Sequence, residues 1–120
     1  MTISPTRRSL LWLRHHGYTV FITEHWNGFA EIRQDLLGFI DLIALRPNAK
    51  GILGVQTTGG QSNFAARVKK VTQSRHATLW LQTGNQIQVH GWVQNGVRKP
   101  WRLLIEGWGD DATTHQRLES

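Results

Sequence analysis

The 120-residue sequence contains no cysteine, which excludes a disulfide framework, cysteine-ligated zinc or iron–sulfur sites and thiol catalysis. It also lacks long hydrophobic runs, and the longest, such as residues 10–13 and 42–45, are far too short to cross a bilayer. No charged segment followed by an apolar one opens the chain. We therefore expect no secretory signal, no membrane partner and a cytoplasmic, intracellular protein.

Two common cofactor motifs are missing as well. Gly59-Gly60 is not followed by the Lys-Ser/Thr pair of a phosphate-binding loop, so we expect no nucleotide cofactor. No two histidines stand at His-Glu-x-x-His spacing, and with no cysteine available we expect no zinc.

Acidic residues are scarce. The chain has 14 Lys and Arg against 8 Asp and Glu, for a formal net charge of +6. Nucleic acid is the commonest partner of a small basic protein, because neutralising its phosphates releases counterions. The alternative reading is that the charge only keeps the protein in solution.

The hydrophobic pattern predicts one α/β domain with a mixed sheet flanked by helices, in the order helix, three strands, one or two helices, two strands. Ser4 caps a first helix that begins at Pro5 and stops at Gly17. The domain is expected to cover residues 1–109, and residues 110–120 are expected to form a flexible tail. The later elements are expected as strands in 18–24, 40–45 and 52–58, helices in 62–74 and 77–82, and strands in 86–93 and 101–108, with a turn signal at Asn27-Gly28 between the first two strands.

Half of the acidic residues fall within one short segment. Glu24, Glu31, Asp35 and Asp41 are four of the eight, and neighbouring carboxylates attract a hard divalent cation. Asp41 lies in an apolar run that predicts burial, and a buried carboxylate needs a partner. That partner is either a metal ion or an arginine, Arg33 or Arg46.

Three further residues are candidates for the site. Gln56, inside an apolar strand, is either a satisfied core amide or an oxygen donor to the ion at Asp41. His25, next to Glu24, is a candidate water-activating base. Trp26 could stack on a base, although core packing is the commoner role of tryptophan. The other tryptophans (Trp12, Trp80, Trp92, Trp101 and Trp108) are expected mostly in the core, and His90 is expected in packing or on the surface.

The stretch GFIDLIAL, a turn, ILGVQTT and a following basic helix resemble the PD-(D/E)XK nuclease superfamily, with a restriction-endonuclease-like core. The likeness is greatest to small Holliday-junction-resolvase-like and VRR-NUC-like members. In this resemblance Asp41 matches the metal-binding Asp, Gln56 matches the Glu and Thr58 matches the Lys of the motif.

The resemblance implies a site that holds Mg²⁺ or Mn²⁺. Asp41, Gln56 and the Thr57 backbone carbonyl would bind the ion, and Glu24 or Asp35 would complete the shell. Gln in place of Glu keeps an oxygen but removes a charge, whereas Thr in place of Lys removes the cation that orients the attacking water. Arg67 or Lys70, on the helix after Thr58, could replace that cation.

The function expected from this resemblance is a metal-dependent DNA endonuclease that hydrolyses phosphodiester bonds, on branched or structured DNA, as a homodimer. Its catalytic residues would be Asp41, Gln56, Thr58 and Glu24. The DNA backbone would be held by cations that are otherwise only a solvated surface: Arg7, Arg8, Arg33, Arg67, Lys69 and Lys70. The alternative function is a nuclease fold with a decayed site that binds DNA or a protein without cutting, which Thr58 favours.

Overall fold

The computed structural model describes residues 3–109 and 111–119, the last nine by their backbone alone. The fold is α/β, as expected. Its elements are α1 (Pro5–His15), β1 (Thr19–Ile22), β2 (His25–Asn27), β3 (Ile32–Gln34), β4 (Leu42–Leu45), β5 (Leu53–Gly59), α2 (Gln61–Gln73), α3 (Arg75–Gln82), β6 (Gln86–Gln94), β7 (Trp101–Gly109) and β8 (Asp111–Glu119).

Six strands form one mixed sheet in the order β1-β4-β5-β6-β7-β8. Strand β5 pairs with β6 in parallel, and every other neighbouring pair in this sheet is antiparallel. The predicted helical crossover is confirmed, because α2 and α3 lie between β5 and β6 in the chain. A parallel pair requires such a crossover, because the chain must return to the end of the sheet where the first strand began before the second strand can start.

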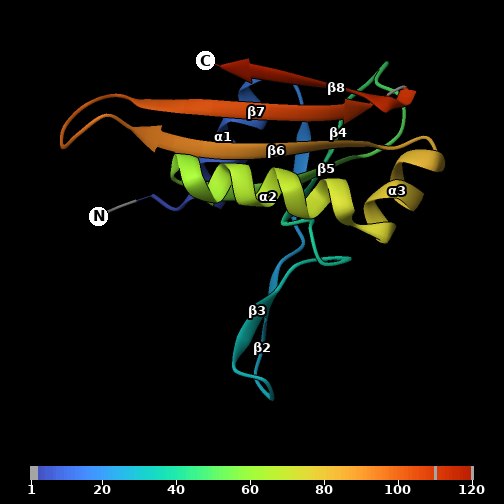
Figure 1. The fold of residues 1–120 in the computed structure, drawn as a ribbon, viewed down its shortest axis with the longest axis horizontal. Coiled ribbons are helices and arrows are strands. Elements are labelled where there is room, and N and C mark those ends of the chain that lie inside the picture. Colours follow the sequence, from blue (N-terminus) through green and yellow to red (C-terminus); the bar gives the residue numbers. More distant parts are fainter. Residues whose placement is uncertain (1–2, 110, 120) are drawn as a thin grey trace.

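Helices cover both faces of the sheet, with α2 in front of it and α1 behind it in Figure 1. The core under α2 and α3 contains Phe64, Ile87 and Val89, whereas the core under α1 contains Leu13 and Val55. Strand β6 therefore lies between two apolar layers. This explains why its second half is buried at consecutive positions, rather than alternating as the sequence pattern suggested.

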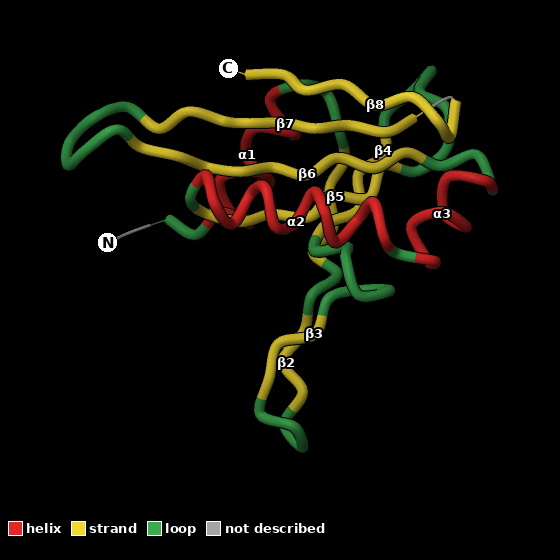
Figure 2. The backbone as a smooth tube through the Cα atoms, in the orientation of Figure 1, coloured by secondary structure: helices red, strands yellow, loops and turns green. Residues whose placement is uncertain are grey.

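Strands β2 and β3 form a separate two-stranded sheet that projects from the body (Figure 2). We call residues 25–34 the arm. The turn signal at Asn27-Gly28 is confirmed as the link between its two strands.

The first helix follows its sequence signals. The Ser4 Oγ accepts a hydrogen bond from the Arg7 backbone N at 3.1 Å, Pro5 is the first helical residue, and Gly17 follows the helix with φ of +89°. These are the features of a capped start and a glycine stop.

Three expectations need correction. Five strands rather than three precede α2, because residues 25–34, where only a turn was expected, pair with each other as β2 and β3. The segment expected to be a flexible tail instead forms β8, which pairs with β7 because β7 would otherwise leave an edge of unpaired backbone groups; residues 110 and 120 lie outside the described part. Trp101 is 38% exposed rather than in the core, because it lies at the outer end of β7, where the Arg8 guanidinium lies over its ring, 4.3 Å from the centroid.

None of the helices among the described residues is long and apolar enough to cross a membrane.

Candidate functional site

A cavity of about 350 Å³ opens where the start of α1, the base of the arm, strand β5 and helix α2 meet. These four elements come from separate parts of the chain, and the sheet order brings them to one place. The cavity is lined by Pro5, Thr6, Glu24, Arg33, Asp35, Asp41, Gln56, Thr57, Thr58, Gly59 and Arg67.

Asp41 lies at the inner wall of this cavity, just before β4, and is only 5% exposed. Its carboxylate Oδ2 accepts hydrogen bonds from the Thr57 backbone N at 2.8 Å, the Thr57 Oγ1 at 3.3 Å and the Gln56 Nε2 at 3.2 Å. The predicted burial is confirmed. The arginine alternative is wrong for the described residues, because neither Arg33 nor Arg46 forms a salt bridge with Asp41.

Burial raises the pKa of the Asp41 carboxyl from its ordinary value of 3.8 to about 6. Loss of hydration is the largest cause, and the negative charges of Glu24 and Asp35 add to it. The hydrogen bonds from Thr57 and Gln56 act in the opposite direction. The fold therefore holds a carboxylate in a place that disfavours its charge.

Gln56 projects from β5 beside Asp41 and is 3% exposed. Its Nε2 donates to Asp41 Oδ2 and, at 3.3 Å, to Asp35 Oδ2. Its carbonyl Oε1 is buried without a hydrogen-bond partner among the described residues. A buried unpaired carbonyl costs roughly 1–3 kcal/mol, so an oxygen left in this state is unusual outside a binding site.

A second group of polar atoms connects α1 to the site. The hydroxyls of Thr6 and Thr57 are 2.8 Å apart, and the Thr6 Oγ1 donates to Glu24 Oε1 at 3.4 Å. Thr6 was not predicted as a site residue. A threonine in the first turn of a helix is ordinary, so the sequence carries no signal for it.

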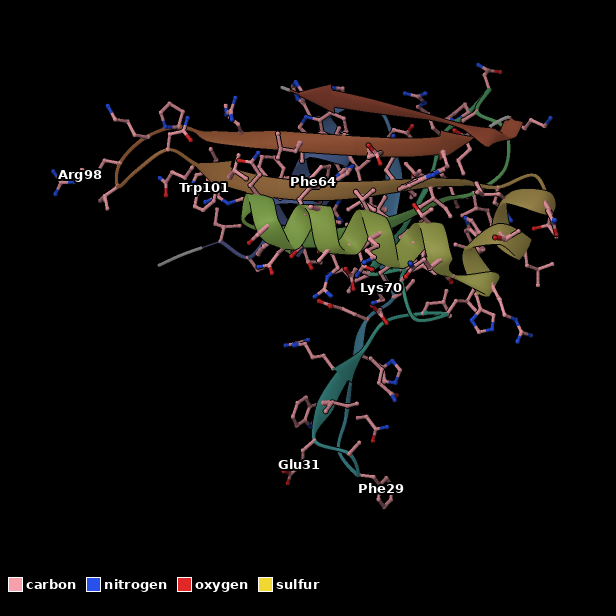
Figure 3. All side chains as sticks on the ribbon, viewed as in Figure 1. Phe29, Glu31, Phe64, Lys70, Arg98 and Trp101 are labelled. Carbon is pink, nitrogen blue, oxygen red and sulfur yellow. The ribbon has the colours of Figure 1, made fainter. Side chains whose placement is uncertain are left out.

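Asp35 joins the site to α2. Its Oδ2 accepts from Gln56 and also lies 3.7 Å from the Nζ of Lys70. Lys70 is 42% exposed in its side chain, so this ion pair is loose. The pair nevertheless places a cation beside the carboxylate that contacts Gln56, and Figure 3 shows Lys70 on the side of α2 above the arm.

The remaining predicted residues divide into two groups. Arg33 and Arg67 line the cavity, and Thr58 lies on its wall, 8% exposed. Arg7, Arg8 and Lys69 are outside the cavity lining. No cation occupies position 58, so the positive charge at the cavity comes from Arg33 and Arg67.

His25 and Trp26 do not line the cavity. Trp26 is 59% exposed, so the core reading is wrong for it. His90 is fully buried, with its Nδ1 2.8 Å from Ser9 Oγ and its Nε2 2.8 Å from Gln88 Oε1. Because Gln88 Oε1 can only accept, Nε2 carries the ring proton and Nδ1 accepts from the Ser9 hydroxyl, which in turn accepts from the indole Nε1 of Trp92. Burial lowers the pKa of His90 to about 3, and the residue is a neutral core histidine.

The described residues contain no group of three or more His, Cys, Asp or Glu side chains placed to hold a metal ion. Around Asp41 the structure instead places the amide of Gln56, whose nitrogen faces the carboxylate, and the Thr57 hydroxyl, which contacts that of Thr6. Glu24 and Asp35 lie on the cavity wall.

Comparison with known proteins adds little. No protein-family model and no solved structure matches the chain. The C/D polypeptide of the NADH-quinone oxidoreductase of Rhodopseudomonas palustris (strain HaA2) is 26% identical over 65 residues, which are 54% of this chain and 11% of that protein. The chain spans about a tenth of the length of this relative, and so limited a match places it in no family.

Proposed function

We propose that the protein is a nuclease of the restriction-endonuclease-like type that uses Mg²⁺ or Mn²⁺ to hydrolyse DNA phosphodiester bonds. The observation that carries the proposal is the buried Asp41 carboxylate beside Gln56, whose Nε2 donates to Asp41 and whose Oε1 has no partner among the described residues, in a cavity lined by two arginines.

The donor set suits a hard, hydrated cation. Asp41 offers a carboxylate whose hydrogen bonds from neighbouring residues all reach Oδ2, which leaves Oδ1 to bind an ion. Gln56 Oε1 and the Thr57 backbone carbonyl would add neutral oxygens. Mg²⁺ keeps several waters and takes only one or two carboxylates from a protein, so it does not require a cluster of three.

Each residue then has a distinct task. Asp41 and Gln56 would hold the ion, which when bound polarises the phosphate and lowers the pKa of a water. Arg67 and Arg33 would bind the phosphate and offset the charge that develops on it, in place of the cation missing at Thr58. Glu24, with Thr6 beside it, would accept a proton or orient a water at the cavity mouth.

The test uses supercoiled, branched and single-stranded DNA with Mn²⁺, Mg²⁺ or a chelator. We expect cleavage that the chelator abolishes and that Asp41→Asn lowers by at least about a hundredfold, because the main charged ligand is lost. Glu31→Gln, which removes the same charge at the end of the arm, is the matched control and should still cleave. Binding without cleavage under every ion would contradict the proposal.

A second measurement does not depend on activity. A ligand that binds only the folded state stabilises it by about 2.7 kcal/mol at a hundred times its dissociation constant. Mn²⁺ should therefore raise the melting temperature of the native sequence and of Glu31→Gln, but not that of Asp41→Asn. Equal shifts in all three proteins would place the ion elsewhere.

The buried Thr58 favours a second function, a nuclease fold that binds DNA without cutting it. In this case the native protein would bind DNA in the absence of metal, and Gln56→Glu combined with Thr58→Lys would create metal-dependent cleavage. Cleavage by the native sequence would contradict this second function.

A further inference from the structure

The arm rises directly from the cavity. Glu24, the residue before β2, and Asp35, the residue after β3, both line the cavity, and so does Arg33 within the arm itself. A nucleic acid strand with one phosphate in the cavity would therefore place its neighbouring nucleotides beside the arm.

The arm exposes aromatic side chains that the body does not cover. Trp26 is 59% exposed and Phe29, at the far end, is fully exposed and points away from the body in Figure 3. An isolated two-stranded hairpin is only marginally stable in water, and exposed aromatic rings lower its solubility. Aromatic side chains presented in this way are typical of a surface that acquires a partner.

The end of the arm is held in shape by its own hydrogen bonds. The Asn27 Oδ1 accepts from the backbone N of Phe29 at 3.0 Å and of Ala30 at 3.2 Å, and the Asn27 Nδ2 donates to Gln34 Oε1 at 3.2 Å. These bonds fix the turn that carries Phe29. The ring is thus presented outward by an ordered turn.

The pairing of the strands shows which face of the arm matters. Trp26 lies directly opposite Arg33 in the ladder, so the two side chains share a face. Because Arg33 lines the cavity, this is the face continuous with the cavity. Ile32 pairs with Asn27 and therefore lies on the other face.

This combination of side chains favours nucleobases over a protein surface. An exposed indole beside a guanidinium, next to a cavity with further cations, is the arrangement with which proteins stack unpaired bases and follow the phosphates. A contact between two copies of this chain would require a continuous apolar surface, whereas the cross-strand neighbour of Trp26 is Arg33 and that of Ile32 is Asn27, so the two exposed apolar strand residues lie on opposite faces of the arm, each beside a polar side chain. Bases inside a duplex are already stacked and present no free face to Trp26.

We propose that the arm binds unpaired bases of DNA, by stacking on Trp26 beside Arg33 and on Phe29 at its end, and so directs single-stranded segments to the cavity. The inference rests on the proposed function, since it takes the phosphates to lie in the cavity, and it adds the class of DNA that the site accepts.

The test measures binding of fluorescent oligothymidine and of a fully paired hairpin DNA by anisotropy, with chelator and in the Asp41→Asn protein so that nothing is cut. Trp26→Leu keeps an apolar side chain but removes the ring, and should weaken oligothymidine binding by about tenfold. Phe29→Leu should act in the same direction. Binding to the paired hairpin should change by less than about twofold.

The controls separate stacking from other roles of the arm. Trp26→Phe retains a ring and should keep most of the binding, and Ile32→Ala, on the opposite face, should leave it unchanged. An equal loss for oligothymidine and paired DNA, or no loss in Trp26→Leu, would overturn the inference. So would a dimer in sedimentation velocity that Trp26→Leu and Ile32→Ala both dissociate.

The binding results for the arm variants can be judged whether or not the protein cleaves DNA. If the native protein cuts DNA but the arm variants bind normally, the inference fails and the proposed function stands. If the variants lose single-strand binding but no protein cuts under any ion, the inference holds for a protein that only binds.

Discussion

At the scale of single residues, Asp41 shows how the site is in conflict with the stability of the fold. A carboxyl group whose pKa is higher in the folded than in the unfolded state binds protons more readily when folded, so its contribution to stability becomes more unfavourable as the pH rises through 4 to 6. Such a cost is common at sites that must hold a charge for another purpose.

We therefore predict that Asp41→Asn stabilises the metal-free protein. With a pKa of about 6 against 3.8, the buried charge costs up to about 3 kcal/mol near pH 7.5 and only about 1 kcal/mol near pH 4.5. Urea unfolding of both proteins in chelator should show a difference that shrinks over this pH range. An asparagine variant that is less stable near pH 7.5 would contradict this explanation of Asp41.

His90 changes the pH dependence of stability in the opposite direction to Asp41. Its pKa is lowered to about 3 in the fold, so the unfolded chain binds a proton below about pH 6.5 that the folded chain refuses, and acid favours unfolding. Between about pH 7 and pH 5 this costs about 2 kcal/mol. In urea titrations, His90→Gln should lose less stability over this interval than the native protein does. The same loss in both would show that His90 is not the group responsible.

At the scale of elements, β6 and α2 pack closely against each other. A methyl group on Gly91 would stand 2.6 Å from Cδ1 of Phe64, whose side chain is 1% exposed and cannot move away. Figure 3 shows Phe64 where α2 crosses the sheet. The small residue at position 91 therefore sets how closely the helix approaches β6.

Gly91→Ala should accordingly destabilise the protein by about 1–3 kcal/mol, through overpacking. Gly28→Ala is the matched control, because a methyl group there would meet nothing within 4 Å, and it should leave stability unchanged within about half a kcal/mol. Urea unfolding measures both. Equal effects of the two substitutions would show that α2 adjusts its position without cost.

The sequence predicted most of the elements because their signals are local. Ser4 and Pro5 begin α1, and the apolar run before Arg46 predicts a buried strand whatever its partners are. The pairing of β8 with β7 was not predictable in this way, because its residues carry little apolar content and the strand is held at the edge of the sheet by backbone pairing with β7 alone.

The site was predictable only in part, for a similar reason. Asp41 and Gln56 are polar residues in apolar strands, and such conflicts are visible in a sequence. Thr6 carries no such signal, since a threonine in the first turn of a helix is ordinary. Its contact with Thr57 depends on how α1 crosses the sheet, which no local pattern determines.

At the scale of the whole molecule, the charge of +6 is distributed unevenly. Arg33 and Arg67 stand on the wall of a cavity that also contains Glu24, Asp35 and Asp41. Further cations lie on the surface, where Arg8 covers Trp101 and Arg98 is carried by the turn between β6 and β7 (Figure 3). The cavity wall thus combines both signs of charge, as the proposed binding of a phosphate beside a metal ion requires.

The separate ladder of the arm has a consequence for how the protein can change. No hydrogen bond of the six-stranded ladder passes through residues 25–34, and the two ends of this segment lie together at the cavity. Residues can therefore be inserted into the arm or exchanged there without shifting the register of β4 or β5. Substitutions in the arm can thus change the binding that we propose for it while the Asp41 carboxylate and the Gln56 amide stay in place.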